Sequence, residues 1–307
     1  MDDIFRNMSA IVEIMTKQRI LQLLKIIGIL LFAWILSRTD RVQLLSTLQQ
    51  INWMIFLAAI PCFGGIYLTK TLRWHALVQA TGLRPTLKES WQLYMIGIFL
   101  GNITPAKIGE LGRAAYLKKQ GLSTKIGILL SIVDRAADAI IIAIFGALSV
   151  GILIKDGWVY VSYATLILLI IALCILHIYK KIISMTLPFV KIFLRRIHPH
   201  LVHKVIITTI LGWIFYFAWA VLLARSLGIT IEVHILVATF TITGLVAMLP
   251  IAPSGLGTRD AVLVMLLRQY GVSAEHAVAL ALLMFTVIIL MSMPGGWYWL
   301  QKSDKKA

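Results

Sequence analysis

The chain has 307 residues, of which 60% are hydrophobic and 14% charged, against about 25% charged in a typical soluble domain. Together with a mean hydropathy of +0.90, this composition excludes a soluble globular domain and predicts an integral membrane protein. The net charge of +16 does not indicate nucleic-acid binding, because lysine and arginine form short clusters between apolar runs, as they do in membrane loops.

Six apolar segments are long enough to cross a bilayer, for which a helix needs about 20 residues. They are 20–37, 52–72, 126–154, 158–179, 205–224 and 275–300. Ahead of them, Ile4, Met8, Ile11 and Met15 recur at helical spacing, which predicts a short interfacial helix within residues 1–19. The prediction is a single, all-α, polytopic transmembrane domain.

Two further apolar runs, 91–103 and 235–249, are too short to cross, because each would reach only ~20 Å at the rise of an α-helix. Each is followed by a polar stretch with proline and glycine, "GNITPAKIGELGR" in the first case and "PIAPSGLGTRD" in the second. Proline and glycine interrupt helices. The pattern therefore predicts two re-entrant helical hairpins.

The distribution of basic residues fits a layout in which the N-terminus is cytoplasmic and both short runs turn back. Most lysines and arginines outside the spans then lie on the cytoplasmic side. The layout puts both termini in the cytoplasm and makes residues 180–204 a basic cytoplasmic loop on anionic lipid. We expect a protein of the bacterial or archaeal cytoplasmic (inner) membrane.

An internal repeat relates the two halves of the chain. "GLSTKIGILL", which begins at Gly121, matches "GVSAEHAVAL", which begins at Gly271, at glycine, serine and the apolar positions. Pro105 and Pro253 are each followed by a glycine four residues on. The predicted halves are residues 20–154 and 155–300. With three spans and one hairpin each, they form an inverted repeat, which is typical of transporters.

Charged residues at membrane depth are costly and usually functional. Three groups of charged residues, with the polar residues and glycines beside them, stand out at the predicted breaks and inside a span. They are Thr104, Lys107, Glu110 and Arg113; Asp134, Arg135 and Asp138; and Ser254, Gly255, Gly257, Thr258, Arg259 and Asp260. In the middle group the two aspartates lie four residues apart on one helix face. Close carboxylates disfavour double ionisation, so a cation, a proton or an arginine must lie between them.

The two broken segments have the features of an anion site. A helix that starts after a Pro/Gly turn presents free backbone N–H groups, and its dipole favours an anion there. Gly255 and Gly257 allow a ligand to approach the backbone, and Arg259 adds a guanidinium that suits phosphate. Lys107 and Arg113 would do the same from the first hairpin. We predict a site for the anionic headgroup of a membrane lipid.

A second interpretation is that the charges only pair with one another and fasten the hairpins. Asp134, Arg135 and Asp138 fit this best, with charge pairing or proton coupling as their functional alternative. The segment Arg73-Trp74-His75, at the end of a predicted span, is interpreted as an interfacial anchor. The two cysteines and the histidines lack metal-binding spacing, so no metal site and no cofactor are predicted.

The motifs "TPAKIGELGRAAYL", "SIVDRAADAI", "LPIAPSGLGTRDAVLVMLL" and "MPGG" resemble the lysylphosphatidylglycerol synthase transmembrane-region family, also called flippase-like domain proteins, from about residue 20 to 300. The family's pattern often has Arg at Lys107, Glu at Asp134 and Asp260, and Gly at Ser254. Charge is kept at these positions, but a lysine at 107 lacks the bidentate geometry of arginine.

The resemblance implies a lipid translocase-like membrane domain. The chain ends at Ala307, soon after its last span, so no aminoacyl-transferase activity is expected, and a separate lipid- or glycan-synthesising enzyme is an expected partner. Our first hypothesis is a flippase for a phosphate-bearing lipid of the aminoacyl phospholipid or polyprenyl-phosphate type. The alternatives are an intramembrane enzyme or transferase subunit acting on a lipid phosphate, and a secondary transporter for a small solute or ion.

Overall fold

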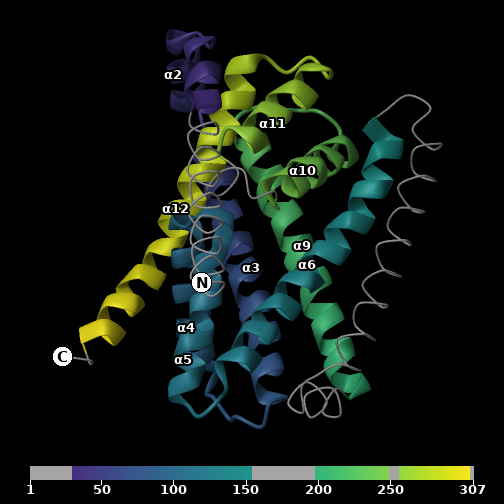
Figure 1. Cartoon of the computed structure of the whole chain (residues 1–307). Coiled ribbons are helices and arrows are strands. Elements are labelled where there is room, and N and C mark those ends of the chain that lie inside the picture. The colour runs from purple at the N-terminus through teal and green to yellow at the C-terminus, as the bar shows by residue number, and fades with distance from the viewer. Residues whose placement is uncertain (1–29, 154–197, 249–255, 305–307) are drawn as a thin grey trace, which may run out of the picture.

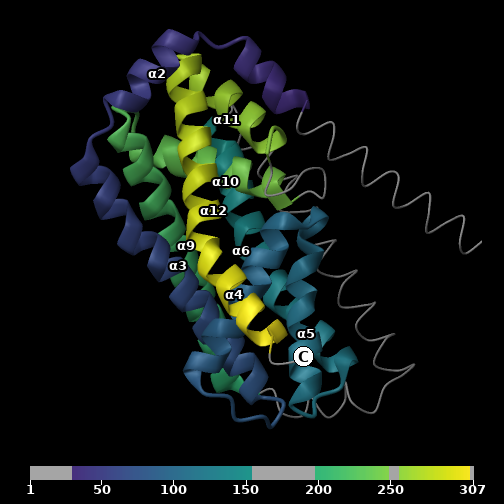
Figure 2. The ribbon, with the colours of Figure 1, turned by 90° about the vertical axis from the view of Figure 1, so that its left-hand side faces the viewer.

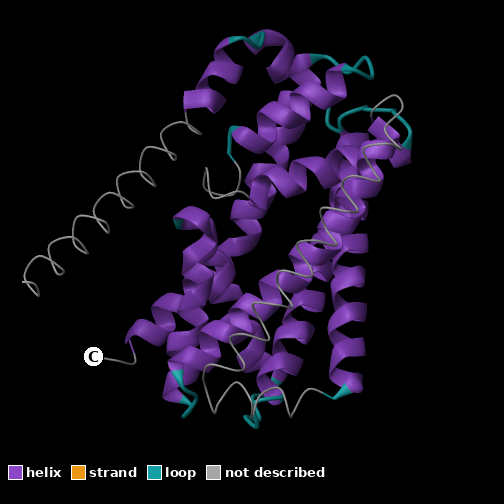
Figure 3. Ribbon diagram, turned by 45° about the vertical axis from the view of Figure 1, so that its right-hand side comes forward, coloured by secondary structure: helices purple, strands orange, loops and turns teal. Residues whose placement is uncertain are grey.

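The computed structural model describes residues 30–153, 198–248 and 256–304, and this part of the chain is helical, without strands (Figures 1 and 3). Four of its helices are long and apolar enough to cross a membrane. They are α3 (Trp53–Gln79), α6 (Thr124–Leu153), α9 (Pro199–Ser226) and α12 (Ala274–Asp304). These helices confirm four of the six predicted spans. Of the other two, 158–179 and most of 20–37 lie outside the described residues.

The first broken segment folds back on itself as a helical hairpin. It consists of α4 (Leu87–Ile103), the 3-10 helix η1 (Pro105–Gly112) and α5 (Arg113–Lys119). A Cβ at Gly97 would lie 2.7 Å from the Arg113 side chain, and one at Gly101 would lie 2.6 Å from Glu110. Gly97 thus contacts the later residue Arg113, and Gly101 contacts the earlier residue Glu110. The two arms of the hairpin are therefore antiparallel.

The second broken segment consists of α10 (Val233–Met248) and α11 (Thr258–Arg268), which contact each other. Residues 249–255, which connect them in the sequence, lie outside the described part. In Figure 1, α4 and α5 lie in the lower half of the molecule, whereas α10 and α11 lie in its upper half. The two hairpins therefore belong to opposite ends of the helix bundle.

The repeated glycines end the second arm of each hairpin in the same way. Gly121 and Gly271 have φ of +89° and +78°, a left-handed conformation that glycine adopts without strain. The N–H of Leu122 donates to the Leu117 carbonyl at 3.1 Å, and the N–H of Val272 donates to the Leu267 carbonyl at 3.3 Å. Both are six-residue hydrogen bonds of the Schellman type, so the sequence repeat corresponds to a repeated helix end.

Close packing of α3 against α9 forms the centre of the bundle. Phe63 of α3 lies edge-to-face on Trp219 of α9, with ring centroids 4.9 Å apart. Gly65 allows Phe215 to approach the α3 backbone. On the other side, α12 crosses in front of α4 (Figure 2), where Gly295 lies against the backbone of Met95. This packing fixes the position of the first hairpin in the bundle.

The closest backbone approach within the first hairpin is at Gly109. A Cβ added there would lie 2.3 Å from the carbonyl oxygen of Leu100, a backbone atom that cannot rotate away. We expect Gly109→Ala to lower the free energy of unfolding by about 1–3 kcal/mol, because the arms must separate. Thermal unfolding of the purified protein in detergent measures this.

Gly112→Ala is the matched control. A Cβ there would lie 3.4 Å from the mobile Cδ1 of Leu100, so its thermal midpoint should stay close to wild type. Equal midpoints for the two variants would contradict the antiparallel packing of this hairpin.

Candidate functional site

Arg73 of α3 forms a buried ion-pair cluster with the two aspartates of α6. Its Nε donates to Asp134 Oδ1 at 2.7 Å, and its two terminal nitrogens donate to Asp138 at 2.8 and 3.0 Å. Nη1 also donates to Thr209 Oγ1 of α9 at 2.9 Å. The Arg73 side chain has no exposed surface. One guanidinium therefore lies between two carboxylates that would otherwise repel each other, and it joins three helices.

Arg113 joins the first hairpin to the same cluster. Its two terminal nitrogens lie 3.3 Å from Asp134 Oδ2, and its Nε donates to the Glu110 carbonyl oxygen at 3.0 Å. The guanidinium carbon lies 4.2 Å from the ring centroid of Trp74 and 4.9 Å from that of Tyr94. Since aromatic rings and a carboxylate surround it, Arg113 positions the hairpin and has no free face for a ligand.

A second tier of ion pairs is more accessible. Lys70 of α3 donates to Asp138 Oδ2 at 2.7 Å, and Arg135 of α6 pairs with Glu110 of the hairpin. The side chains of Lys70 and Arg135 are 21% and 34% exposed, whereas Arg73 is fully buried. Glu110 also lies 3.6 Å from Arg113. We call the buried tier, Arg73, Arg113 and Asp134, the inner cluster. Lys70, Arg135, Glu110 and Asp138 form the outer cluster.

In the second hairpin, Arg259 and Asp260 pair with each other at the start of α11. Arg259 Nη2 and Nε lie 2.6 and 2.9 Å from Asp260 Oδ1, and Nη2 donates weakly to the Ala281 carbonyl at 3.4 Å. The N–H of Gly257 donates to Asp260 Oδ2 at 3.0 Å. The prediction of free N–H groups at this helix start is therefore wrong for Gly257, because the chain's own carboxylate binds it.

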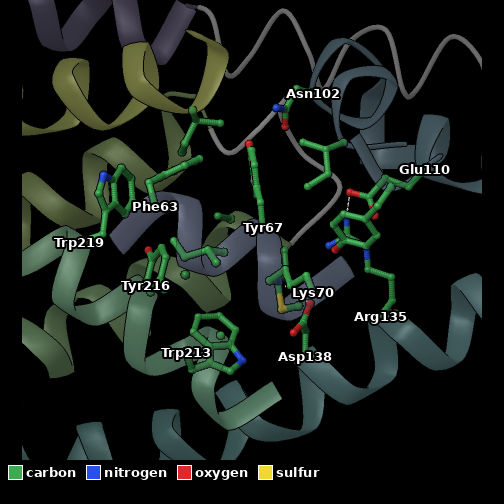
Figure 4. A pocket seen from close by; sticks show the side chains of 18 of the residues that line it. Phe63, Tyr67, Lys70, Asn102, Glu110, Arg135, Asp138, Trp213, Tyr216 and Trp219 are labelled. Atoms are coloured by element: carbon green, nitrogen blue, oxygen red, sulfur yellow. Dashed lines mark hydrogen bonds and ion pairs between the residues drawn. The ribbon is translucent and has the colours of Figure 1, made fainter. Parts of the chain in front are cut away.

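Both hairpins and the long helices α3, α6 and α9 surround a cavity of about 180 Å³ (Figure 4). Its charged lining groups are Lys70, Glu110, Arg135, Asp138 and Arg259. Its aromatic lining groups are Phe63, Tyr67, Tyr94, Trp213, Tyr216 and Trp219. Asn102 from the first hairpin and Gly244, Ala247 and Met248 from the second complete the polar and small-residue parts of the wall.

The predicted site residues separate into three classes. Glu110, Arg135, Asp138 and Arg259 line the cavity together. The remaining described ones do not line it. They are Thr104, Arg113, Asp134, Gly257, Thr258 and Asp260. Thr104 Oγ1 donates to the Leu100 carbonyl and accepts from the N–H of Gly109, so it stabilises the hairpin turn. Ser254, Gly255 and the Lys107 side chain lie outside what the structure describes.

The interpretation of Arg73 as an interfacial anchor is wrong. Helix α3 continues to Gln79, beyond the predicted end of its span. Arg73 therefore lies within this helix and is buried in the interior of the bundle. Lys70 was also missed. The signal was present: Lys70 and Arg73 are three residues apart on one helix face, which matches Asp134 and Asp138 four apart on another. The aromatic wall on α9 gave no comparable signal among so many apolar residues.

The described residues offer no group of three His, Cys, Asp or Glu side chains close enough to hold a metal ion. The cavity's carboxylates already contact cationic side chains. The chemistry that remains available is recognition of an anion by the cationic groups of the outer cluster and Arg259.

Comparison with known proteins gives consistent matches along the chain. The family model described as "Lysylphosphatidylglycerol synthase TM region" matches residues 20–296. A UPF0104 membrane protein of Methanocaldococcus jannaschii is 24% identical over 246 residues, covering 69% of this chain and 73% of the relative. Two UPF0104 membrane proteins of Methanothermobacter thermautotrophicus are 27% and 21% identical, covering 68% and 84% of this chain and 72% and 88% of the relatives.

Removing the central guanidinium tests the inner cluster. Arg73→Met leaves Asp134 and Asp138 buried with fewer counter-charges, and breaking a buried pair from one side costs about 3–5 kcal/mol. We expect a large fall in the thermal unfolding midpoint in detergent. Arg84→Met, at an exposed arginine in the α3–α4 connection, is the control and should unfold like wild type. Equal midpoints for Arg73→Met and Arg84→Met would refute a structural role for this cluster.

Proposed function

We propose that this chain, which belongs to the lysylphosphatidylglycerol synthase transmembrane-region family, moves a phosphate-bearing lipid across the membrane. The observation that carries the proposal is the cavity between the two hairpins. It combines cations from α3, α6 and the second hairpin in a bundle otherwise built from apolar helices. Buried cations in excess of what a stable fold needs are costly, which favours a functional role.

The cavity's size suits a headgroup. Ligand pockets that enclose drug-sized molecules have volumes of about 300–1,000 Å³, and this cavity has about 180 Å³. A phosphate with a small substituent fits such a space, whereas acyl or prenyl chains do not. In our proposal the chains stay in the bilayer. Lys70, Arg135 and Arg259 hold the phosphate.

The opposed hairpins provide a route for alternating access. We propose that each is re-entrant, that the first opens toward the cytoplasm and that the second opens toward the outside. In transporters built as inverted repeats, the site lies near the midplane and the two halves rock around it. The pairs that join a hairpin to a long helix, such as Glu110 with Arg135, would separate as the first hairpin moves.

The orientation follows from the basic residues. The lower end of the bundle in Figure 1, where α5 ends and α9 begins, carries Lys118, Lys119, Lys125 and Lys204. By the positive-inside rule this end faces the cytoplasm, with the C-terminus on that side. We propose a cytoplasmic (inner) membrane location, and a separate lipid- or glycan-synthesising enzyme as the supplier of the lipid.

Neutralising one outer-cluster cation tests transport without breaking the inner cluster. Glu110 keeps Arg113 as a neighbour at 3.6 Å when Arg135 is replaced by glutamine. A hydrogen bond to a charged group contributes about 1.5–3 kcal/mol, so Arg135→Gln should slow translocation about tenfold or more. The measurement is the rate at which a fluorescent phosphatidylglycerol becomes accessible to an external quencher in reconstituted vesicles.

Arg84→Gln, outside the cavity, is the control and should translocate like wild type. If the protein does not accelerate movement of the lipid, or if wild type and Arg135→Gln move it at equal rates, a flippase that uses this cavity is excluded. Formation of a new lipid product by the purified protein would instead favour the enzyme hypothesis. Uptake of a water-soluble solute without lipid movement would favour a solute transporter.

A further inference from the structure

Among the described residues, the ion pairs of the inner cluster, the outer cluster and the second hairpin do not balance in charge. Five cationic side chains belong to them: Lys70, Arg73, Arg113, Arg135 and Arg259. Four carboxylates oppose them: Glu110, Asp134, Asp138 and Asp260. One positive charge is therefore in excess inside a low-dielectric region, where uncompensated charge is expensive. A ligand with one negative charge would bring this set to neutrality.

Six aromatic side chains make up much of the rest of the cavity wall. In Figure 4, Phe63, Tyr216 and Trp219 lie on one side, away from Glu110 and Arg135 on the other. Tyr67 and Tyr216 of this wall carry hydroxyl groups that can donate and accept hydrogen bonds. A hydroxylated group can bond with such hydroxyls and offers C–H faces that can contact the rings.

A cationic substituent would be poorly accommodated. Aromatic walls can bind ammonium groups, but the Lys70 ammonium of this chain already lies 5.8 Å from the ring centroid of Trp213. The two carboxylates that line the cavity, Glu110 and Asp138, are paired with Arg135 and with Lys70 and Arg73. A positively charged headgroup would thus meet an excess of positive charge.

From these observations we infer that the ligand is a phosphodiester lipid with one net negative charge and an uncharged, hydroxylated headgroup, a polyol or a sugar. The inference rests on the proposed function and narrows its substrate. The phosphodiester lies against the outer cluster and Arg259. The hydroxylated group lies against the aromatic wall of α3 and α9.

A lipid series of differing charge tests the inference on the wild-type protein. Unlabelled lipids in detergent compete with phosphatidylglycerol that carries a fluorescent acyl chain. Phosphatidylglycerol and phosphatidylinositol should compete about tenfold better than neutral phosphatidylethanolamine, cationic lysylphosphatidylglycerol and phosphatidic acid. One mismatched charge at about 10 Å and an effective dielectric of about 20 should weaken binding about tenfold or more, and a phosphomonoester carries nearly two charges.

Variants that alter the charge of the cavity should change which headgroup charge binds best. Glu110→Gln raises the excess to two positive charges. Phosphatidic acid should then compete about tenfold better, relative to phosphatidylglycerol, than it does with wild type. Lys70→Gln removes the excess positive charge, so competition by phosphatidylethanolamine should improve to a similar degree. Lys118→Gln, at an exposed lysine of α5 outside the cavity, is the matched control and should leave the order unchanged. If either charge variant fails to fold, the wild-type series decides alone.

The outcomes separate this inference from the proposed function. Preference for phosphatidylglycerol and phosphatidylinositol supports both. Preference for lysylphosphatidylglycerol, phosphatidylethanolamine or phosphatidic acid overturns the inference and leaves a lipid-translocating function in place. Failure of every lipid to compete, in a protein that also translocates none, overturns both.

Discussion

The architecture depends on one buried arginine. Arg73 places a single guanidinium between Asp134 and Asp138, within 3.0 Å of both, and also binds Thr209. Without a counter-ion, two carboxylates on one face of an apolar helix would drive that helix toward water. With Arg73 in place, α3, α6 and α9 are held together deep in the bundle. Arg113 then attaches the first hairpin to the same carboxylates.

The two charged clusters differ in their access to the cavity. The inner cluster is enclosed: Arg73 has no exposed surface, and Arg113 lies against the rings of Trp74 and Tyr94. The outer cluster borders a cavity that residues of both hairpins also line. A structural lock therefore lies directly beside charged groups that line the cavity.

The hydropathy pattern and the proline–glycine breaks predicted the four spans that the structure describes and both broken segments. Apolar length and helix-breaking residues are local properties of the sequence, so a local pattern can find them. The sequence also singled out Asp134, Asp138 and Glu110, which the structure shows to be buried. Arg73 was misplaced because a minimal span was assumed, whereas α3 runs for 27 residues. Its partner Asp134 is 61 residues away. Such a pairing depends on packing between helices, which no local pattern specifies. The capping of Gly257 by Asp260 was missed for a related reason, since competition between a ligand and the chain's own carboxylate depends on side-chain geometry.

If the cavity between the hairpins holds the phosphate of a lipid, that lipid should remain on the purified protein. Native mass spectrometry of wild type beside an Arg259→Gln/Asp260→Asn double variant measures this. The double variant removes the second hairpin's cation and its paired carboxylate together, so net charge is unchanged. We expect wild type to retain a defined phosphate-bearing lipid and the variant to lose it. If neither protein retains lipid, or if both retain the same mixture of bulk phospholipids, the claim is contradicted.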